Sequence, residues 1–289
     1  MDTIMDQNIS QLGIHEYFGI VVIVDALGVS DYTIEECKRL VYNFEEINSQ
    51  KEEFLEIFSK ESSQPEWDGA QTISNVMNNV KTSQFGDTII LAFPIEDKYN
   101  LENFVAIYFV AAHLCSVIVQ GLTLKVPFRG AISIGKFLWE DSNKRILGPA
   151  IADANDWCNT TEWFGIIFSP KAQLWLSTLL ETNKSNTDVA LLMPSFGNFI
   201  CKYNIPLKSS LKEPLNSQIN SEYFFVVAWP SFFHYLRVLD KQNKVVEELN
   251  GKWLFKQVLS DLSQPKGTEL KYKNSVDFFN WYEKVMVKK

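Results

Sequence analysis

The chain has 289 residues, of which 46% are hydrophobic and 21% are charged, as in an ordinary folded globular protein. Asp and Glu outnumber Lys and Arg by 35 to 27, so the formal net charge is −8. This acidic balance argues against general binding of nucleic acids, whose phosphates need a basic surface. The length allows one large domain or two small ones.

Targeting and membrane segments are not expected. The first ten residues are polar and acidic, unlike a signal peptide. The most apolar stretch, 104–119, contains His113 and Cys115 and is bounded by Glu102 and Gln120, so it predicts a buried helix rather than a membrane span. The four cysteines are scattered without C-x-x-C spacing, which predicts reduced thiols in a cytoplasmic protein.

The first part of the chain alternates strand-like and helix-like patterns. Residues 18–25 are mostly β-branched, which predicts a strand buried on both faces. Apolar residues at three- and four-residue steps predict a helix over 33–60. Two β-like stretches, 72–81 and 88–93, are predicted to pair as a hairpin with Gly86 at its tip.

The later elements follow similar patterns. In chain order they are a helix at 101–120, a strand at 128–139, a helix at 149–159, a strand at 165–169, a helix at 171–181, strands at 199–205 and 223–229, and helices at 231–253 and 276–287. Loops are expected at 62–69 and 209–221, and 183–188 is a polar stretch. The opening order, strand–helix–strand–strand–helix–strand, is that of a ferredoxin-like split βαβ core. We therefore expect an α+β fold, with this core over 14–182 and a C-terminal α/β extension over 183–289 packed on it.

Two acidic residues are predicted to lie where strands meet turns. Asp25 ends the first strand, and Asp87 follows Gly86 at the hairpin tip. In a split βαβ sheet the first strand can lie beside that hairpin, so the two carboxylates would converge at one edge. Such a pair suits Mg²⁺ or Mn²⁺, which bind one or two carboxylates together with substrate phosphates, and two such ions can catalyse phosphoryl transfer. The alternative is that each Asp only forms a local turn.

Four segments resemble motifs of the class III nucleotide cyclases. They are 24–30 (VDALGVS, the first metal motif), 85–88 (FGDT, the hairpin motif), 128–135 (FRGAISIG, a later strand) and 148–151 (GPAI, before a helix). They occur in the family's order over about 17–182. The resemblance implies a cyclase core that converts a nucleoside triphosphate to a 3′,5′-cyclic nucleotide and pyrophosphate.

The resemblance also implies roles for individual residues. Asp25 and Asp87 would bind two Mn²⁺ or Mg²⁺ ions, with the backbone carbonyl of Ala26 as a further ligand. The family's site lies between two cyclase domains, so a homodimer is expected, with no nucleic acid or membrane as partner. The residues expected to lie under or beside the nucleotide are Leu27, Gly28, Val29, Ser30 and Ser83.

The positions that read purine bases in the family hold other residues here. Four residues before Asp87 stands Ser83 instead of Lys or Glu, and three residues before Gly148 stands Arg145 instead of Asp or Cys. A pyrimidine substrate, UTP or CTP, is therefore expected. In this the chain is similar to the bacterial cyclases of the Pycsar antiphage systems, which implies a signalling or antiviral defence role.

The family's transition-state residues are also missing. Ala152 stands at the Asn position and Asp156 at the Arg position. Loss of a cation at the developing phosphoryl charge costs several powers of ten in rate. We take Arg145 as the catalytic candidate to replace it. The other cations nearby in sequence are Arg129, Lys136 and Lys144.

Two further hypotheses remain open. If no cation substitutes, the chain is a degenerate, cyclase-like module that binds nucleotides or regulates without turnover. A polymerase-like or diguanylate-synthase relative on the same core is the third hypothesis, although no Gly-Gly-Asp-Glu run is present.

Overall fold

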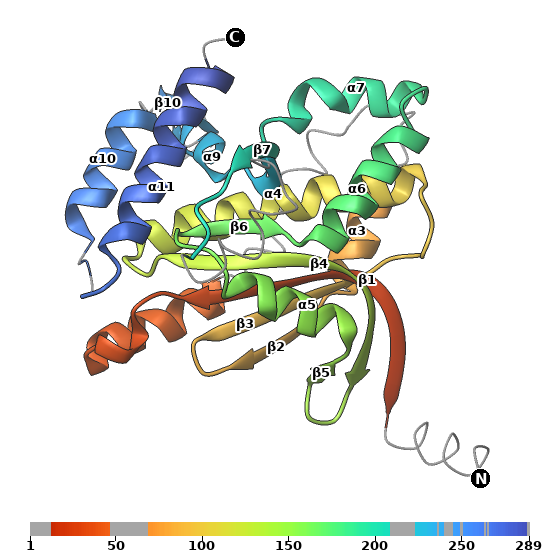
Figure 1. The fold of residues 1–289 in the computed structure, drawn as a ribbon, viewed down its shortest axis with the longest axis horizontal. Helices are drawn as coiled ribbons and strands as arrows, with labels where there is room; N and C mark the ends of the chain where they lie inside the picture. The colour runs from red at the N-terminus through yellow and green to blue at the C-terminus, as the bar shows by residue number, and fades with distance from the viewer. Residues whose placement is uncertain are drawn as a thin grey trace.

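The computed structural model describes residues 13–46, 69–208, 223–235, 237–239, 245–248, 251–262, 264 and 266–287. The predicted loops at 62–68 and 209–221 and the second half of the predicted helix 33–60 lie outside these residues. The described part is a mixed α+β fold, built on one large and mainly antiparallel sheet (Figure 1).

The strands belong to this sheet except for the last two, which pair with each other. Their bounds are β1 Ile14–Ala26, β2 Lys81–Phe85, β3 Thr88–Pro94, β4 Phe128–Glu140, β5 Arg145–Leu147, β6 Gly165–Phe168, β7 Ile200–Asn204, β8 Tyr223–Val227, β9 Arg237–Leu239 and β10 Val245–Glu248. The order across the sheet is β2-β3-β1-β4-β6-β8-β7, with β5 paired to β4.

The first four strands form the predicted split βαβ core. Strand β3 lies between β2 and β1, and β4 flanks β1 on its other side, with all three neighbouring pairs antiparallel. Ile20–Val24 in β1 are almost completely buried because both faces of the sheet are covered. The expected α+β class and the expected core topology are thus confirmed.

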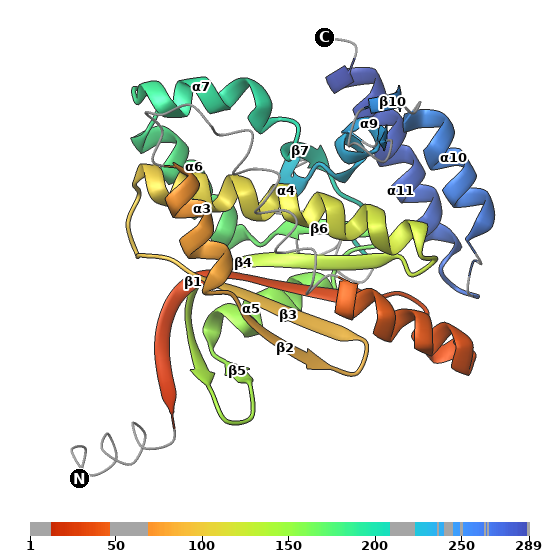
Figure 2. The same ribbon diagram turned by 180° about the vertical axis from the view of Figure 1, so that it is seen from behind.

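Helices cover both faces of this sheet. Their bounds are α3 Gly69–Asn78, α4 Leu101–Thr123, α5 Pro149–Cys158, α6 Pro170–Thr182, α7 Thr187–Phe196, α9 Phe232–Tyr235, α10 Gly251–Asp261 and α11 Glu269–Tyr282, and a further helix covers 34–46. Helix α5 lies in front of the sheet in Figure 1, and α4 lies in front of it in the reverse view of Figure 2. Helix α4 is long and apolar enough to cross a membrane, but 89% of its most apolar window is buried inside the protein.

Two local predictions are wrong, and one helix was missed. Residues 69–78 form α3 rather than a strand, and Val76 and Met77 near the end of this helix are buried against the core. The predicted helix 231–253 is interrupted by β9 and β10. Helix α7, which begins in the polar stretch 183–188, was not predicted; its N-cap Asn186 accepts hydrogen bonds from the next turn.

The C-terminal part continues the core sheet. Strand β8 pairs with β6 through Ile167 and Val226, and β7 pairs with β8. Strands from both sides of the expected boundary at residue 182 therefore belong to one continuous sheet. The division into two domains stays a prediction. Helices α10 and α11 lie side by side over an aromatic cluster in which the rings of Phe255 and Phe279 stack at 3.9 Å.

Candidate active site

Asp25, near the end of β1, is held from two sides. Its Oδ1 accepts a hydrogen bond from the Thr88 hydroxyl at 2.9 Å. Its Oδ2 accepts a hydrogen bond from Arg129 Nε at 2.9 Å and forms an ion pair with Nη2 at 2.8 Å. The side chains of Asp25 and Arg129 are only 18% and 14% exposed. A guanidinium that binds through two nitrogens fixes the orientation of the carboxylate and is a strong partner for it.

The sheet register creates these contacts. Asp25 pairs with Thr88 on β3 and with Arg129 on β4, so the three side chains leave the sheet on the same face. Close approach of β4 to β1 depends on Gly130, where a Cβ atom would lie 2.4 Å from the backbone oxygen of Ile23. A side chain at this position would push Arg129 away from Asp25.

Asp87 lies in the tight turn between β2 and β3, as predicted. Gly86 precedes it with a φ of +61°, a left-handed conformation that favours glycine. The backbone oxygen of Asp87 accepts a hydrogen bond from the amide of Ala26 at 3.1 Å. The Asp87 carboxylate is half-buried and makes no hydrogen bond or ion pair with the residues that the structure describes. Asp87 thus lies next to the end of β1, one residue along from Asp25.

The turn after β1 is locked by local hydrogen bonds. The Leu27 side chain is buried and its amide donates to the oxygen of Pro127 at 2.9 Å, so Leu27 can face a ligand only through its backbone. Gly28 adopts a φ of 79°, and a short 3₁₀ turn, Val29–Asp31, follows. The Tyr32 hydroxyl closes the turn by donating to the oxygen of Leu27 at 3.1 Å.

Tyr32 also links the turn to its surroundings. Its pKa is raised, first by burial and then by the nearby phenol of Tyr272, with Glu36 and Asp87 adding smaller effects. The hydroxyl therefore stays protonated and keeps donating to the turn. The effect of Tyr272 places the C-terminal helix α11 close to this turn.

Ser83 lies on the edge strand β2, on the same face of the sheet as Asp25. It pairs with Ile90, which pairs with Ile23, two residues before Asp25 in β1. Two residues along the strand and two strands across correspond to about 12 Å between the backbones of Ser83 and Asp25. The two residues share a face without touching.

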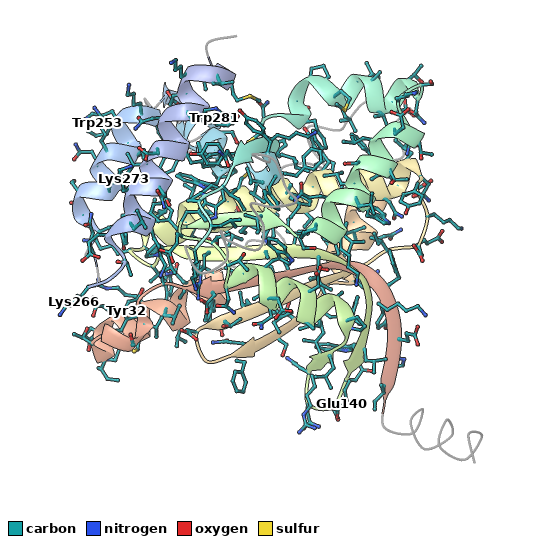
Figure 3. The ribbon with its side chains drawn as sticks, viewed as in Figure 1. Tyr32, Glu140, Trp253, Lys266, Lys273 and Trp281 are labelled. Carbon is teal, nitrogen blue, oxygen red and sulfur yellow. The ribbon has the colours of Figure 1, made fainter. Side chains whose placement is uncertain are left out.

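The structure does not bring Arg145 to Asp25 within one protomer. Arg145 pairs with Glu140 across β5 and β4 and is 70% exposed. Glu140 is level with Ile14 of β1, which is eleven residues from Asp25 and corresponds to roughly 36 Å along the strand. Figure 3 shows Glu140 and Tyr32 at opposite ends of the core. A role of Arg145 at this site stays a prediction that requires a second protomer.

Among the other cations weighed from the sequence, Arg129 alone contacts Asp25. Lys136 is exposed and forms an ion pair with Glu16 at 2.7 Å. Lys144 lies in the turn between β4 and β5, with a φ of 51°. Of the four candidate cations predicted from the sequence, Arg129 is therefore the one that the register of β4 brings to Asp25.

In the family that the chain resembles, residues that stabilise the transition state lie on the helix that corresponds to α5. In this chain the polar residue of α5 that faces inward is Asp153. Asp153 accepts hydrogen bonds from the hydroxyls of Ser133 and Ser169, at 2.6 and 2.5 Å, and these bonds fix the helix to β4 and to the end of β6. Ala152 and Asp156 are consequently exposed. No Lys or Arg occurs within Pro149–Cys158, so α5 presents no cation.

Three polar residues near Asp25 were missed in the sequence. Asn159 accepts a hydrogen bond from Arg129 Nη2 at 3.0 Å. Lys208 and Lys271 lie close enough for their charges to affect groups in this site. Asn159 directly follows α5 and could have been suspected, whereas Lys271 lies 246 residues after Asp25 and carries no local signal.

The donor set fits a divalent metal that arrives with a polyphosphate. The carboxylates of Asp25 and Asp87 and a backbone carbonyl are the hard oxygen ligands that Mg²⁺ and Mn²⁺ accept. Two of about four lone pairs of the Asp25 carboxylate already accept hydrogen bonds, one from Thr88 and one from Arg129. Among the described residues, no group of three or more His, Cys, Asp or Glu side chains could hold a metal. Phosphate oxygens would therefore have to complete the coordination.

Comparisons with known proteins give only distant likenesses. Neither a protein-family model nor a curated protein matches the sequence. Among solved structures, the catalytic core of a rhodopsin-guanylyl cyclase with converted specificity, in complex with ATPalphaS, aligns with a TM-score of 0.40 and 10% identity over 74% of this chain and 97% of that one. The dimeric guanylyl cyclase domain of the RhoGC fusion protein from the aquatic fungus Blastocladiella emersonii gives 0.39 and 11% over 74% and 97%.

A third structure, the guanylyl cyclase Cya2, gives a TM-score of 0.33 and 16% identity over 74% of this chain and 92% of that one. All three TM-scores are below 0.5, so these likenesses do not bear on the chemistry of the site. The geometry of this chain alone supports a functional interpretation.

Proposed function

We propose that the chain is a nucleotide cyclase that acts at a site built around Asp25 and Asp87. The observation that supports it most is the Asp25–Arg129 pair beside the backbone of the Asp87 turn. Carboxylates of this kind can bind divalent ions, and a guanidinium can bind phosphate. The Val24–Ser30 and Phe85–Thr88 motifs that resemble the class III cyclases coincide with this place in the fold.

The proposed reaction closes a ring on the substrate. The ribose 3′-oxygen forms a bond to the α-phosphorus, the bond from the α-phosphorus to the pyrophosphate breaks, and the 3′-hydroxyl proton passes to solvent. The divalent ions, when bound, supply Lewis-acid stabilisation of the phosphoryl oxygens and make the hydroxyl more acidic.

The chain's own residues position these groups. Asp25, Asp87 and the carbonyl of Ala26 hold the ions. Arg129 keeps the Asp25 carboxylate oriented before substrate binds, and its guanidinium exchanges that partner for a phosphate oxygen afterwards. Tyr32 keeps the turn beneath the triphosphate rigid through its bond to Leu27.

A pyrimidine triphosphate, UTP or CTP, is the proposed substrate. The support is chemical, because Ser83 supplies one small hydroxyl where purine enzymes place a charged side chain. The proposed assembly is a homodimer with the site at its interface, working with Mn²⁺ or Mg²⁺ in the cytoplasm in signalling or antiphage defence.

The experiment is a product assay on the purified protein. Each of the four NTPs is incubated with Mn²⁺, and mass spectrometry searches for 3′,5′-cyclic nucleotides. We expect cyclic UMP or cyclic CMP, and at least about a hundredfold loss of product for Asp87→Asn, because removing a metal ligand removes several kcal/mol of stabilisation. The matched control is Asp97→Asn, an exposed residue outside the site. Absence of a cyclic product from every NTP would overturn the proposal.

A second candidate is a module that binds a nucleotide without turnover. The exposed, cation-free surface of α5, with Ala152 and Asp156, favours it. It predicts saturable binding of UTP with Mn²⁺ by calorimetry in a protein that yields no cyclic product. A dinucleotide product with a 5′-to-3′ link would instead support the diguanylate-synthase relationship.

A further inference from the structure

The first turns of helix α11 are docked beside the candidate site by specific hydrogen bonds. Asn274 Nδ2 donates to the oxygen of Glu162 at 2.6 Å. The hydroxyl of Ser275, which is completely buried, accepts from the amide of Phe164 at 2.8 Å. The ring of Tyr272 packs edge-on against Phe164 at 5.5 Å. These contacts hold the start of α11 against the segment that leads into β6.

This segment is one strand away from Arg129. Phe164 precedes Gly165, and Gly165 pairs with Arg129 in the parallel β4–β6 ladder. In Figure 1 the lower end of α11 lies above the start of the helix that follows β1. The C-terminal helix thus reaches the end of the sheet where Asp25 lies, although it is the last helix of the chain.

The half-buried Lys271 is affected by the charges of residues in and around the candidate active site. They are Arg129, Lys208, Asp25 and Glu162. Lys208 is held in place because its amide donates to the oxygen of Thr160 at 2.9 Å. Three cations, from β4, from the segment after β7 and from α11, therefore lie within electrostatic reach of one another and of two carboxylates.

The three cations outnumber the two carboxylates, so an added anion would balance the excess positive charge. The pKa of Lys271 is lowered, first by burial and next by Arg129, so its charge is less favourable here than in water. If Asp25 turns to a metal ion, Glu162 is the carboxylate that remains among the charged groups acting on Lys271. A ligand with several negative charges, such as a polyphosphate, would relieve the repulsion.

We propose that Lys271 and Lys208 complete the triphosphate pocket from the C-terminal extension of the same protomer. The two lysines supply the phosphate-binding charge that helix α5 lacks. This inference rests on the proposed function, since it assigns residues to the same nucleotide site. It gives the extension a direct part in substrate binding, in addition to packing on the core.

The test is calorimetric titration of the full chain with UTP and, separately, with inorganic tripolyphosphate, both with Mg²⁺. We expect Lys271→Ala to weaken both ligands about tenfold, and Lys271→Arg to retain most of the affinity because the charge remains. The control is Lys273→Ala on the same helix, because Lys273 is 70% exposed and pairs with Asp277 at 2.6 Å. Lys273 is labelled in Figure 3. The control should bind like the wild type.

The outcomes separate the two claims. If the wild type binds neither ligand, the proposed function fails and this inference fails with it. If the wild type binds but Lys271→Ala binds equally well, only this inference is overturned; the same holds if Lys271→Ala binds more tightly, as an autoinhibitory helix would predict. Lys208→Ala, on a different segment, gives the same test should Lys271→Ala fail to fold.

Discussion

The guanidinium of Arg129 binds the carboxylate of Asp25 through two nitrogens, at 2.9 and 2.8 Å, where both side chains are largely withdrawn from solvent. This pair joins the central strand of the core to its neighbour at the point where the metal motif begins. It makes Asp25 a residue with two roles, because the same carboxylate contributes to stability and is proposed to bind metal.

Removal of Arg129 should therefore destabilise the fold. Arg129→Ala leaves the Asp25 carboxylate without its charged partner, and we expect a loss of about 1–3 kcal/mol in the free energy of unfolding. Lys136→Ala, on the same strand, removes an exposed pair with Glu16 and should change it by less than about 1 kcal/mol. Urea unfolding followed by circular dichroism measures both. Equal losses in the two variants would show that the buried Asp25–Arg129 pair contributes no more to the free energy of unfolding than an exposed pair.

The hairpin tip should take part in dimer formation. Phe85 is 84% exposed two residues before Asp87, so a large apolar ring stands in solvent beside the site proposed to lie at the interface. Phe85→Ser should raise the dimer dissociation constant at least about tenfold. Leu174→Ser, 72% exposed on α6, is the matched control. Light scattering over a concentration series measures it, and a dimer unchanged by Phe85→Ser would place the interface elsewhere.

Alkaline pH should weaken the fold through Cys158. Burial raises the pKa of this thiol from 9.0 to about 12. Above about pH 9 the unfolded chain loses the proton while the folded chain keeps it, so stability falls as pH rises through this range. Cys158→Ala should lose less stability than the wild type between about pH 8 and about pH 10.5, as denaturant titration at both values would show. Equal losses would mean that Cys158 does not titrate as burial predicts.

Short-range patterns predicted the core well. The β-branched run before Asp25, the Gly86 turn and the apolar helix 101–120 each encode their structure locally, and the split βαβ topology followed from their order. The pattern misled at 72–81, where β-favouring residues occur in a segment that packs as helix α3. Tertiary contacts determine the helical structure of that segment, and such contacts commonly override the intrinsic propensity of the residues.

The site was predictable only in part. Asp25 and Asp87 stand out because each follows a strand-and-turn pattern, and Arg129 lies in a recognisable strand. The β1–β4 register determines that Arg129, and not Lys136 or Arg145, lies opposite Asp25, because the register fixes which residues are level across the sheet. Lys271 could not be predicted, since only the docking of α11 against the segment before β6 brings it near Arg129.

The most direct test of the metal site is Mn²⁺ binding followed by electron paramagnetic resonance, with and without a non-reactive UTP analogue. We predict weak binding of Mn²⁺ alone, tight binding when the analogue is present, and loss of that tight binding in Asp87→Asn but not in Asp97→Asn. Binding of Mn²⁺ and analogue that is unchanged by Asp87→Asn would contradict the assignment of Asp25 and Asp87 as the metal ligands of a nucleotide cyclase.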